Sequence, residues 1–329
     1  MRPAEAGITV AGRAGDCTQD LCRDRLLNTR QMGRGGPEVP VICFGTWPVG
    51  GAYGAVEEER AVATMRAALD SGLTFIDTAE GYKNAEAIIG KSIQGRRDEL
   101  FIATKVSGHD HSTGHINQAI EQSLTKMGTD HVDLYQLHTA TDRPVQDTME
   151  DLLRLRDAGK IRYIGISNFS PEQIAEIAAA GPVHSGQPRY NMLFREVEDA
   201  ILPAYLENGV GVMAHSVLAK GMLGGRYKPG DRFISEDERA GWHHFQGDMF
   251  KQIHAVTEKL KAWAMDHGRD LPQLAIAWPL HHPSVYTSIV GARRPEDVVG
   301  CAKAGDWTLS VQDLVEIEAI QGDFRLYPK

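Results

Sequence analysis

The sequence predicts a single (β/α)8 barrel of the TIM type, an α/β fold, with an N-terminal β-hairpin plug and an additional C-terminal helix. The chain has 329 residues, which is long enough for one such barrel. From Asn28 onward, short apolar runs alternate with longer segments of helical period, the order typical of a parallel sheet built from βα units. The strand-like runs match the number of strands in a closed barrel. They cover residues 41–44, 74–76, 100–104, 132–137, 163–166, 186–190, 211–214 and 286–290.

An extension and a hairpin are expected before the first barrel strand. Residues 1–27 are rich in Arg, Asp, Gly and Ala and show no hydrophobic period. We therefore expect a disordered extension, followed by a single barrel domain at residues 28–329. Residues 29–32 and 39–43 flank a turn rich in glycine with one proline, which is typical of a hairpin. We expect this hairpin to close one end of the barrel.

Apolar stripes and end signals predict the helices between the strands. The stripe residues are Val62, Met65 and Leu69 in the first helix and Ile116, Ile120 and Leu124 in a later one. Gly72 is expected to end the first helix, and Ser170 followed by Pro171 is expected to begin another. Residues 309–320 predict the additional C-terminal helix.

Composition and charge exclude several classes of function. A net charge of −9 and a pI near 5.8 argue against a nucleic-acid or anionic-membrane surface, because either requires clustered positive charge. The chain has no apolar run of about 18 residues and no signal-peptide pattern, so we expect a cytoplasmic protein without a membrane partner. Its cysteines indicate neither a disulfide framework nor a zinc site. They are Cys17, Cys22, Cys43 and Cys301.

Ionisable side chains end three successive predicted strands. Asp77, Lys105 and His138 each follow an apolar run, and parallel strand ends share one rim, where barrel enzymes carry their catalytic groups. Tyr82 lies in the loop that leaves the second strand. Carbonyl reduction by hydride transfer leaves an alkoxide that needs a proton, which a tyrosine can donate if its pKa of about 10 is lowered. We expect Lys105 to lower that pKa and Asp77 to hold Lys105. A neutral His138 would then orient the carbonyl oxygen.

Other interpretations of these residues stay open at this point. Asp77 and Lys105 could instead form a purely structural ion pair. His138 could likewise be a core histidine whose hydrogen bonds are all made within the fold. Three such residues at consecutive strand ends, with Tyr82 in reach, favour catalysis. A strand-end lysine can instead act as the nucleophile of a Schiff-base lyase or aldolase, although Asp77 would keep Lys105 protonated. A non-catalytic redox sensor or regulatory subunit is the third interpretation.

Several segments together resemble the signature segments of the aldo-keto reductases. They are FIDTAEGY at residues 75–82, ATK at 103–105, LYQLH at 134–138, GISNF at 165–169 and SIVGARRPE at 288–296. The resemblance runs from Asn28 to the C-terminus. It implies the same barrel fold, which potassium-channel β subunits share, and NAD(P)H-dependent reduction of an aldehyde or ketone, or the reverse reaction. It further implies a small carbonyl or sugar substrate and a catalytic tetrad of Asp77, Tyr82, Lys105 and His138.

The resemblance also implies that NADPH is the cofactor, with NADH as the alternative. The expected carboxamide contacts are Ser167, Asn168 and Gln187. The expected entrance residues are Gly45, Thr46 and Trp47, and the expected substrate contacts are Trp47, Tyr82 and His138. The other expected cofactor contacts are Asp77, His215, Ser216, Leu218, Lys220, Gly291, Arg293 and Arg294. Arg293 or Arg294 is expected to bind a 2′-phosphate.

The sequence departs from the family pattern near both ends of the expected cofactor site. After the adenosine-end loop, family members usually carry Gln or Arg and then Glu-Asn, whereas this chain has Asp297, Gly300 and Cys301. A carboxylate at Asp297 would repel a 2′-phosphate but could bind a ribose hydroxyl, which weakens the case for NADP over NAD. His215 replaces the usual stacking Tyr or Trp, and Val217 replaces the usual proline.

Three further segments are interpreted without a catalytic role. Residues 209–214 match G-x-G-x-x-A but lead into a strand, so we expect a turn and no phosphate cradle. The histidine-rich segment 109–115 could in principle bind a metal, but we expect a mobile polar loop, whose place at the rim allows contact with substrate. The segment 225–250 contains Trp242, His243 and Phe245, which are expected to form a lid over the substrate or to pack against the barrel.

Overall fold

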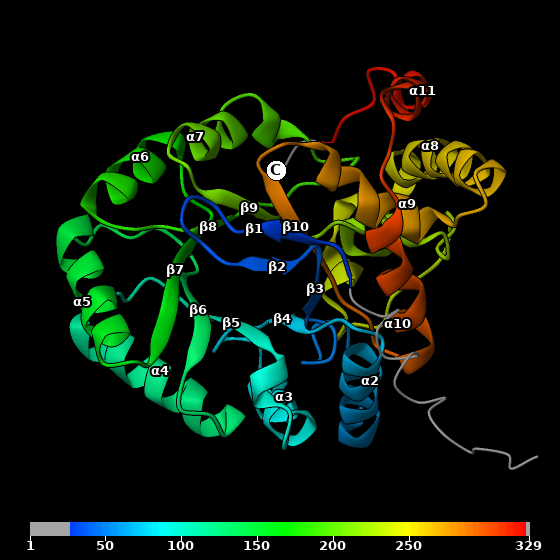
Figure 1. The fold of residues 1–329 in the computed structure, drawn as a ribbon. Coiled ribbons are helices and arrows are strands. Elements are labelled where there is room, and N and C mark those ends of the chain that lie inside the picture. The colour runs from blue at the N-terminus through cyan, green and yellow to red at the C-terminus, as the bar shows by residue number, and fades with distance from the viewer. Residues whose placement is uncertain (1–26, 327–329) are drawn as a thin grey trace, which may run out of the picture.

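The computed structural model describes residues 27–326, which form a closed parallel barrel (Figure 1). The barrel strands are β3 (Ile42–Gly45), β4 (Phe75–Asp77), β5 (Phe101–Val106), β6 (Val132–Leu137), β7 (Ile161–Ser167), β8 (Ser185–Gln187), β9 (Gly211–Ala214) and β10 (Val285–Val290). Each pairs in parallel with the next along the chain, and β10 closes the barrel against β3. The predicted (β/α)8 barrel is therefore confirmed.

A ring of helices surrounds the strands (Figure 1). The helices are α2 (Glu58–Asp70), α3 (Ala85–Ser92), α4 (Thr113–Met127), α5 (Val145–Asp157), α6 (Pro171–Ala180), α7 (Ile201–Glu207), α8 (Gly247–Asp266), α9 (Leu271–Ala277), α10 (Pro295–Ala302) and α11 (Val311–Gln321). The predicted stripe residues Met65 and Leu69 of α2 are buried, while Val62 is half-buried. α11 is the additional C-terminal helix. It begins at Val311 because Ser310 caps it.

The predicted helix ends agree with the structure. Ser170 and Gln173 form a reciprocal capping box at the start of α6, and Pro171 is the first helical residue. Gly72 follows the end of α2 with a φ of +87°, and its N–H donates to the backbone oxygen of Leu69. Glycine adopts this left-handed conformation without steric cost, so it allows the chain to turn into β4.

The N-terminal hairpin closes one end of the barrel. It consists of β1 (Thr29–Gln31) and β2 (Glu38–Pro40), which pair antiparallel. Met32 and Val39 are buried and pack on the side chains inside the barrel, among them Phe75. Leu27 also packs against the core, while residues 1–26 of the expected extension lie outside the described residues. The plug predicted from the sequence is thus present.

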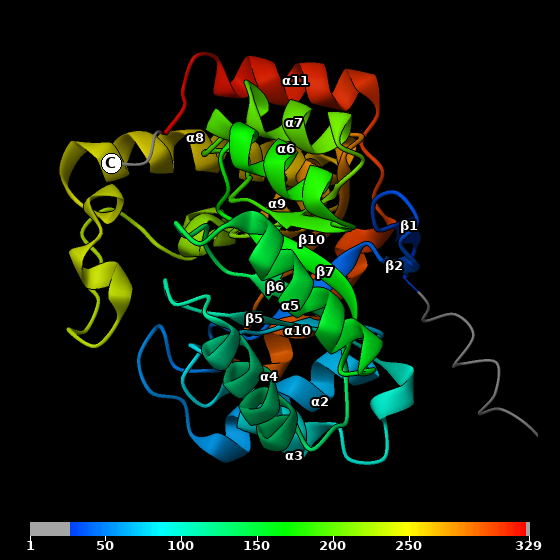
Figure 2. The same cartoon turned by 90° about the vertical axis from the view of Figure 1, so that its left-hand side faces the viewer.

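A long connection between β9 and α8 lies at the other end of the barrel (Figure 2). We call residues 225–245 of this connection the strap. Arg239 anchors the strap from a buried position, where its guanidinium binds Asp237 and lies 4.3 Å from the centre of the Tyr53 ring. Phe245 is buried, and Trp242 stacks on Phe194 with 5.9 Å between the ring centres. These aromatic side chains therefore pack against the fold.

The helices and the cysteines can be compared with what the composition led us to expect. None of the helices within residues 27–326 is long and apolar enough to cross a membrane. Cys43 and Cys301 are buried free thiols, while Cys17 and Cys22 lie outside the described part of the chain.

Candidate active site

The four expected tetrad residues lie together at the C-terminal ends of neighbouring strands. Asp77 is the last residue of β4, Lys105 is the next-to-last residue of β5, and His138 directly follows β6. The Lys105 ammonium donates to Asp77 Oδ2 at 2.7 Å and to the backbone oxygen of Thr78 at 2.8 Å. It also donates to Tyr82 Oη at 3.4 Å. The strand register therefore brings together side chains that are far apart in sequence.

The ion pair at the centre of the tetrad is buried and fully hydrogen-bonded. Lys105 is 0% exposed and Asp77 is 2% exposed. Gln136 and Gln187 donate to the second oxygen of the Asp77 carboxylate, at 3.2 and 2.9 Å. Burial lowers the pKa of Lys105, but Asp77 and Tyr82 outweigh that effect and raise it above its ordinary value. A buried ammonium ion is a poor nucleophile, which counts against the Schiff-base alternative.

Tyr82 is a protonated phenol with an unusually high pKa. Burial raises the pKa of Tyr82, Lys105 lowers it, and Asp77 raises it. The expectation that Lys105 brings this pKa below its ordinary value is therefore wrong, because the lost hydration of the phenolate outweighs the attraction of the ammonium ion. Tyr82 consequently carries its proton at neutral pH, which a general acid requires.

His138 is neutral and is oriented by two neighbours. Burial and the charge of Lys105 lower the pKa of His138 to about 4, so the ring is uncharged at neutral pH, as expected. Ser107 Oγ lies 2.9 Å from His138 Nδ1, and Asn168 Nδ2 donates to the backbone oxygen of His138 at 3.0 Å. When the Ser107 hydroxyl donates to Nδ1, the ring proton resides on Nε2. That tautomer offers Nε2–H as a donor to a ligand.

The low pKa of His138 makes the stability of the fold depend on pH. In the unfolded chain a histidine has a pKa of about 6.5, so as the pH falls the unfolded state takes up the proton first. We therefore expect the free energy of unfolding to decrease between pH 6.5 and about 4. Urea unfolding at a series of pH values should show a smaller decrease for His138→Gln than for the wild type. His111 and His215 shift in the same direction, so the variant should remove only part of the slope.

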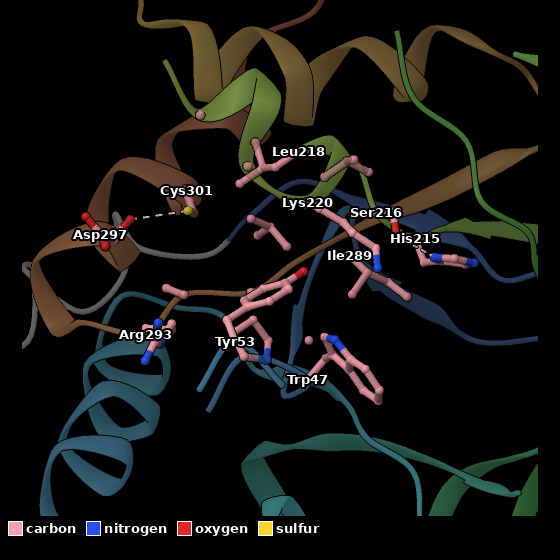
Figure 3. A pocket seen from close by; sticks show the side chains of 18 of the residues that line it. Trp47, Tyr53, His215, Ser216, Leu218, Lys220, Ile289, Arg293, Asp297 and Cys301 are labelled. Carbon is pink, nitrogen blue, oxygen red and sulfur yellow. Dashed lines mark hydrogen bonds between the residues drawn. The ribbon is translucent and has the colours of Figure 1, made fainter. Parts of the chain in front are cut away.

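A cavity of about 990 Å³ extends from the tetrad to the beginning of α10. Figure 3 shows Trp47 and His215 toward one end of it and Arg293, Asp297 and Cys301 toward the other. The expected residues on its wall are Gly45, Trp47, Asp77, Tyr82, His138, Ser167, Asn168, Gln187, His215, Ser216, Leu218, Lys220, Gly291, Arg293 and Arg294. Thr46 does not line the cavity, since it is buried and its hydroxyl donates to the backbone oxygen of Asp77 at 3.0 Å.

Two expected cofactor contacts have specific roles in the structure. The Gln187 amide donates to Asp77, so it supports the buried carboxylate and is not a free donor on the cavity wall. His215 hydrogen-bonds Ser216 Oγ through Nδ1 at 2.9 Å. Burial and the charge of Lys105 lower the pKa of His215 to about 3, which makes its ring neutral. A neutral imidazole on the wall is suited to stacking on a flat ring.

Strained backbone is concentrated on the cavity wall. Asn168, Ser216 and Lys220 all have positive φ, at 57°, 57° and 55°, and line the cavity. Ala219, beside Lys220, has a φ of 47°. This conformation is unfavourable for residues other than glycine, and such residues are found preferentially at functional sites. The strain therefore supports the assignment of the cavity as the site.

At the expected adenosine end of the cavity, two arginines balance the negative charge of Asp297. Arg294 binds both oxygens of Asp297, at 2.9 and 2.8 Å, and Arg226 also pairs with Asp297. Burial raises the pKa of Asp297, but these two guanidinium groups outweigh it and hold the pKa below its ordinary value. Arg293 lies on the same wall, where it donates to the backbone oxygen of Ala55 at 3.3 Å. Arg226 and Arg294 therefore offset the repulsion that Asp297 was expected to exert on a 2′-phosphate.

Several residues of the site were not identified from the sequence. Ser107 lies only two positions after Lys105, and its place beside the end of β5 was the one signal that could have found it. Tyr53, Glu238 and Arg239 line the cavity because the strap crosses over to the loop after β3. No spacing or motif in the sequence indicates that crossing.

The histidine-rich segment is more ordered than expected. His111 is buried, and its Nδ1 lies 3.4 Å from the hydroxyl of Thr141. His115 belongs to α4, and its Nε2 lies 3.3 Å from a Glu80 carboxylate oxygen. Within residues 27–326 the structure assembles no group of three or more His, Cys, Asp or Glu side chains that could hold a metal ion.

Comparison with known proteins identifies the family. Residues 41–321 match the model of the "Aldo/keto reductase family". Aldo-keto reductase YhdN from Bacillus subtilis is 36% identical over 300 residues, which cover 87% of this chain and 91% of the relative. The structure of glycerol dehydrogenase AKR11B4 from Gluconobacter oxydans superposes with a TM-score of 0.82 at 28% identity, covering 92% of this chain and 97% of that one.

A second solved structure agrees with this result. An aldo-keto reductase from Klebsiella pneumoniae in complex with NADPH has a TM-score of 0.73 and 30% identity, over 90% of this chain and 95% of that one. The matches span nearly the whole barrel, including the strands that carry Asp77 and Lys105. The chain therefore belongs to the aldo/keto reductase family.

Proposed function

We propose that this protein is an NAD(P)H-dependent oxidoreductase that reduces an aldehyde or ketone to an alcohol, or catalyses the reverse reaction. The observation that carries the proposal is a protonated Tyr82 phenol hydrogen-bonded to the buried, paired ammonium of Lys105 at the wall of a large cavity. Membership of the family supports it. Three similar proteins also support it: a relative that is named as a reductase, the structure of a glycerol dehydrogenase, and the structure of an aldo-keto reductase in complex with NADPH.

The residues of the cavity fit a nicotinamide dinucleotide. When bound, such a cofactor supplies the hydride that reduces the carbonyl carbon. Ser167, Asn168 and His215 would hold its nicotinamide end beside the tetrad. Arg293 and Arg294 would hold its adenosine end. The positive φ of residues on the wall between these ends also fits a ligand that approaches the backbone closely.

Four residues of this chain would handle the proton. Tyr82 would donate its hydroxyl proton to the alkoxide oxygen. Lys105 would stabilise the phenolate left behind, and Asp77 would keep Lys105 charged and in place. Neutral His138 would donate a hydrogen bond to the carbonyl oxygen before and during reduction. Turnover of a simple aldehyde with NADPH tests this function, because a non-catalytic sensor binds the cofactor without consuming it.

We expect Ser107→Ala to impair the proposed reaction through His138. The hydroxyl 2.9 Å from His138 Nδ1 selects the tautomer with a proton on Nε2, and alanine removes that selection. We expect kcat to fall about tenfold and the affinity for NADPH to stay unchanged, since Ser107 is absent from the cavity wall. Ser107→Thr, which keeps a hydroxyl, should recover most of the loss. Equal activity of the Ala and Thr variants would contradict this role.

We expect the enzyme to prefer NADPH over NADH. Arg226, Arg293 and Arg294 line this end of the cavity, and Arg293 forms no salt bridge within residues 27–326, so its positive charge is available to a 2′-phosphate. Arg294→Gln should weaken NADPH binding about tenfold or more and leave NADH binding nearly unchanged. Fluorescence titration of both cofactors measures this. If Arg294→Gln weakened the binding of NADPH and NADH equally, Arg294 would only support the fold of the loop that precedes α10.

A further inference from the structure

A carboxylate from the strap projects into the cavity near the proposed proton donor. Glu238 Oε1 accepts a hydrogen bond from Trp47 Nε1 at 3.3 Å and from the Lys220 ammonium at 2.9 Å. The Trp47 ring in turn meets the Tyr82 ring edge-on, with 4.7 Å between centres. All four residues line the same cavity. Glu238 is therefore separated from the phenol by a single indole ring.

The position of Glu238 is fixed by its two neighbours in the chain. Asp237 and Arg239 are both buried and bind each other through two hydrogen bonds between their side chains, at 2.9 and 2.6 Å. Asp237 also forms an antiparallel bridge with Tyr53, and the Arg239 guanidinium lies 4.6 Å from the centre of the Phe233 ring. Glu238 lies between these anchors, so its backbone has little freedom. The carboxylate is thus held at the mouth of the site by the fold.

One oxygen of this carboxylate is available to a ligand. Within residues 27–326, Trp47 and Lys220 both bind Oε1 of Glu238, and no protein group donates to Oε2. The Glu238 and Lys220 side chains each retain 29% of their exposure. Because Lys220 is paired with Glu238, it offers no unpaired positive charge to an anion, while Glu238 Oε2 stays open to a ligand. An ionised oxygen accepts hydrogen bonds from hydroxyl groups and repels anions.

We propose that Glu238 is a specificity-determining residue that favours uncharged carbonyl substrates with hydroxyl groups along the chain and disfavours anionic ones. This proposal rests on the proposed reductase function. A hydroxyl group farther along the substrate chain would donate to Glu238 Oε2 while the carbonyl oxygen faces Tyr82. A phosphate or carboxylate group at the same place would meet the Glu238 charge and find Lys220 already paired.

Three aldehydes with the same three-carbon chain test the proposal in the full-length enzyme with NADPH. Glyceraldehyde carries two hydroxyl groups, propanal has the same carbon chain without them, and glyceraldehyde 3-phosphate adds a dianion. For Glu238→Gln we expect kcat/KM to fall about tenfold for glyceraldehyde, mainly through KM, and to stay nearly unchanged for propanal. The same variant should raise kcat/KM for the phosphate ester about tenfold, since it uncovers Lys220. In the double variant Glu238→Gln/Lys220→Gln that gain should disappear.

Glu236→Gln is the matched control, because Glu236 lies on the same strap but its carboxylate hydrogen-bonds only the neighbouring Ser235 within the described chain. It should behave as the wild type toward all three aldehydes. The proposal is overturned if Glu238→Gln changes kcat/KM for glyceraldehyde and propanal by the same factor, or if it alters only NADPH affinity. Failure of the wild type to reduce any aldehyde would instead reject the reductase function itself, so the two failures are distinguishable.

Discussion

The variant Tyr82→Phe is expected to lose at least about a hundredfold in kcat while its NADPH affinity stays within about threefold of the wild type. The substitution deletes one hydroxyl, which donates the proton in the proposed reaction and hydrogen-bonds Lys105. The ring that packs edge-on against Trp47 remains, so the cavity should keep its shape. Steady-state turnover with a saturating aldehyde and fluorescence titration with NADPH measure the two quantities separately.

Tyr53→Phe is the matched control for this experiment. Tyr53 lines the same cavity, but its ring packs on Arg239 and its hydroxyl has no hydrogen-bond partner within residues 27–326. Deleting that hydroxyl should therefore leave kcat within about twofold of the wild type. If Tyr82→Phe and Tyr53→Phe lose the same small amount of activity, the proton reaches the alkoxide from another group.

The second large effect is expected for Lys105→Met, which should abolish most activity and also destabilise the fold. Methionine removes the ammonium ion that stabilises the Tyr82 phenolate, and it leaves the Asp77 carboxylate buried without a counterion. Breaking a buried ion pair on one side typically costs about 3–5 kcal/mol. We expect a loss of this size in urea unfolding at neutral pH, together with a drop in kcat of about a thousandfold.

A second substitution separates the two consequences of losing Lys105. In Lys105→Met/Asp77→Asn the buried negative charge is gone, while the asparagine can still accept the hydrogen bonds from Gln136 and Gln187. The double variant should therefore recover much of the stability but none of the activity. Recovery of activity along with stability would show that Lys105 acts only as a structural counterion and has no part in proton donation.

The barrel and the meeting of Asp77, Lys105 and His138 at one rim could be predicted, because both follow from short-range patterns in the sequence. The strand β6 coincides with its predicted apolar run, and β4 differs from its run by one residue at each end. Once parallel strands are assumed, residues that end them must share one rim, so Asp77, Lys105 and His138 are brought together by topology alone. The cap of α6 at Ser170 was equally readable, because it depends on neighbouring residues.

What could not be predicted depends on contacts between distant segments or on a balance of opposing energies. The strap reaches Tyr53 through an isolated bridge at Asp237, and this crossing places Glu238 in the cavity. The pKa of Tyr82 depends on how completely the ring is buried as well as on the distance to Lys105, and burial prevails. Thr46 lies next to two wall residues yet points away from the cavity, because its hydroxyl binds the backbone of β4.

Isotope transfer tests the central claim, that this cavity delivers a hydride to a carbonyl carbon and a proton to its oxygen. An aldehyde is incubated with the enzyme and NADPH labelled with deuterium at the hydride-donating carbon, and the alcohol is examined by mass spectrometry and NMR. We predict one deuterium on the carbinol carbon for each NADPH consumed, and far slower formation of this product with Tyr82→Phe. Cofactor binding without any labelled alcohol, across a panel of aldehydes and ketones, would contradict the account.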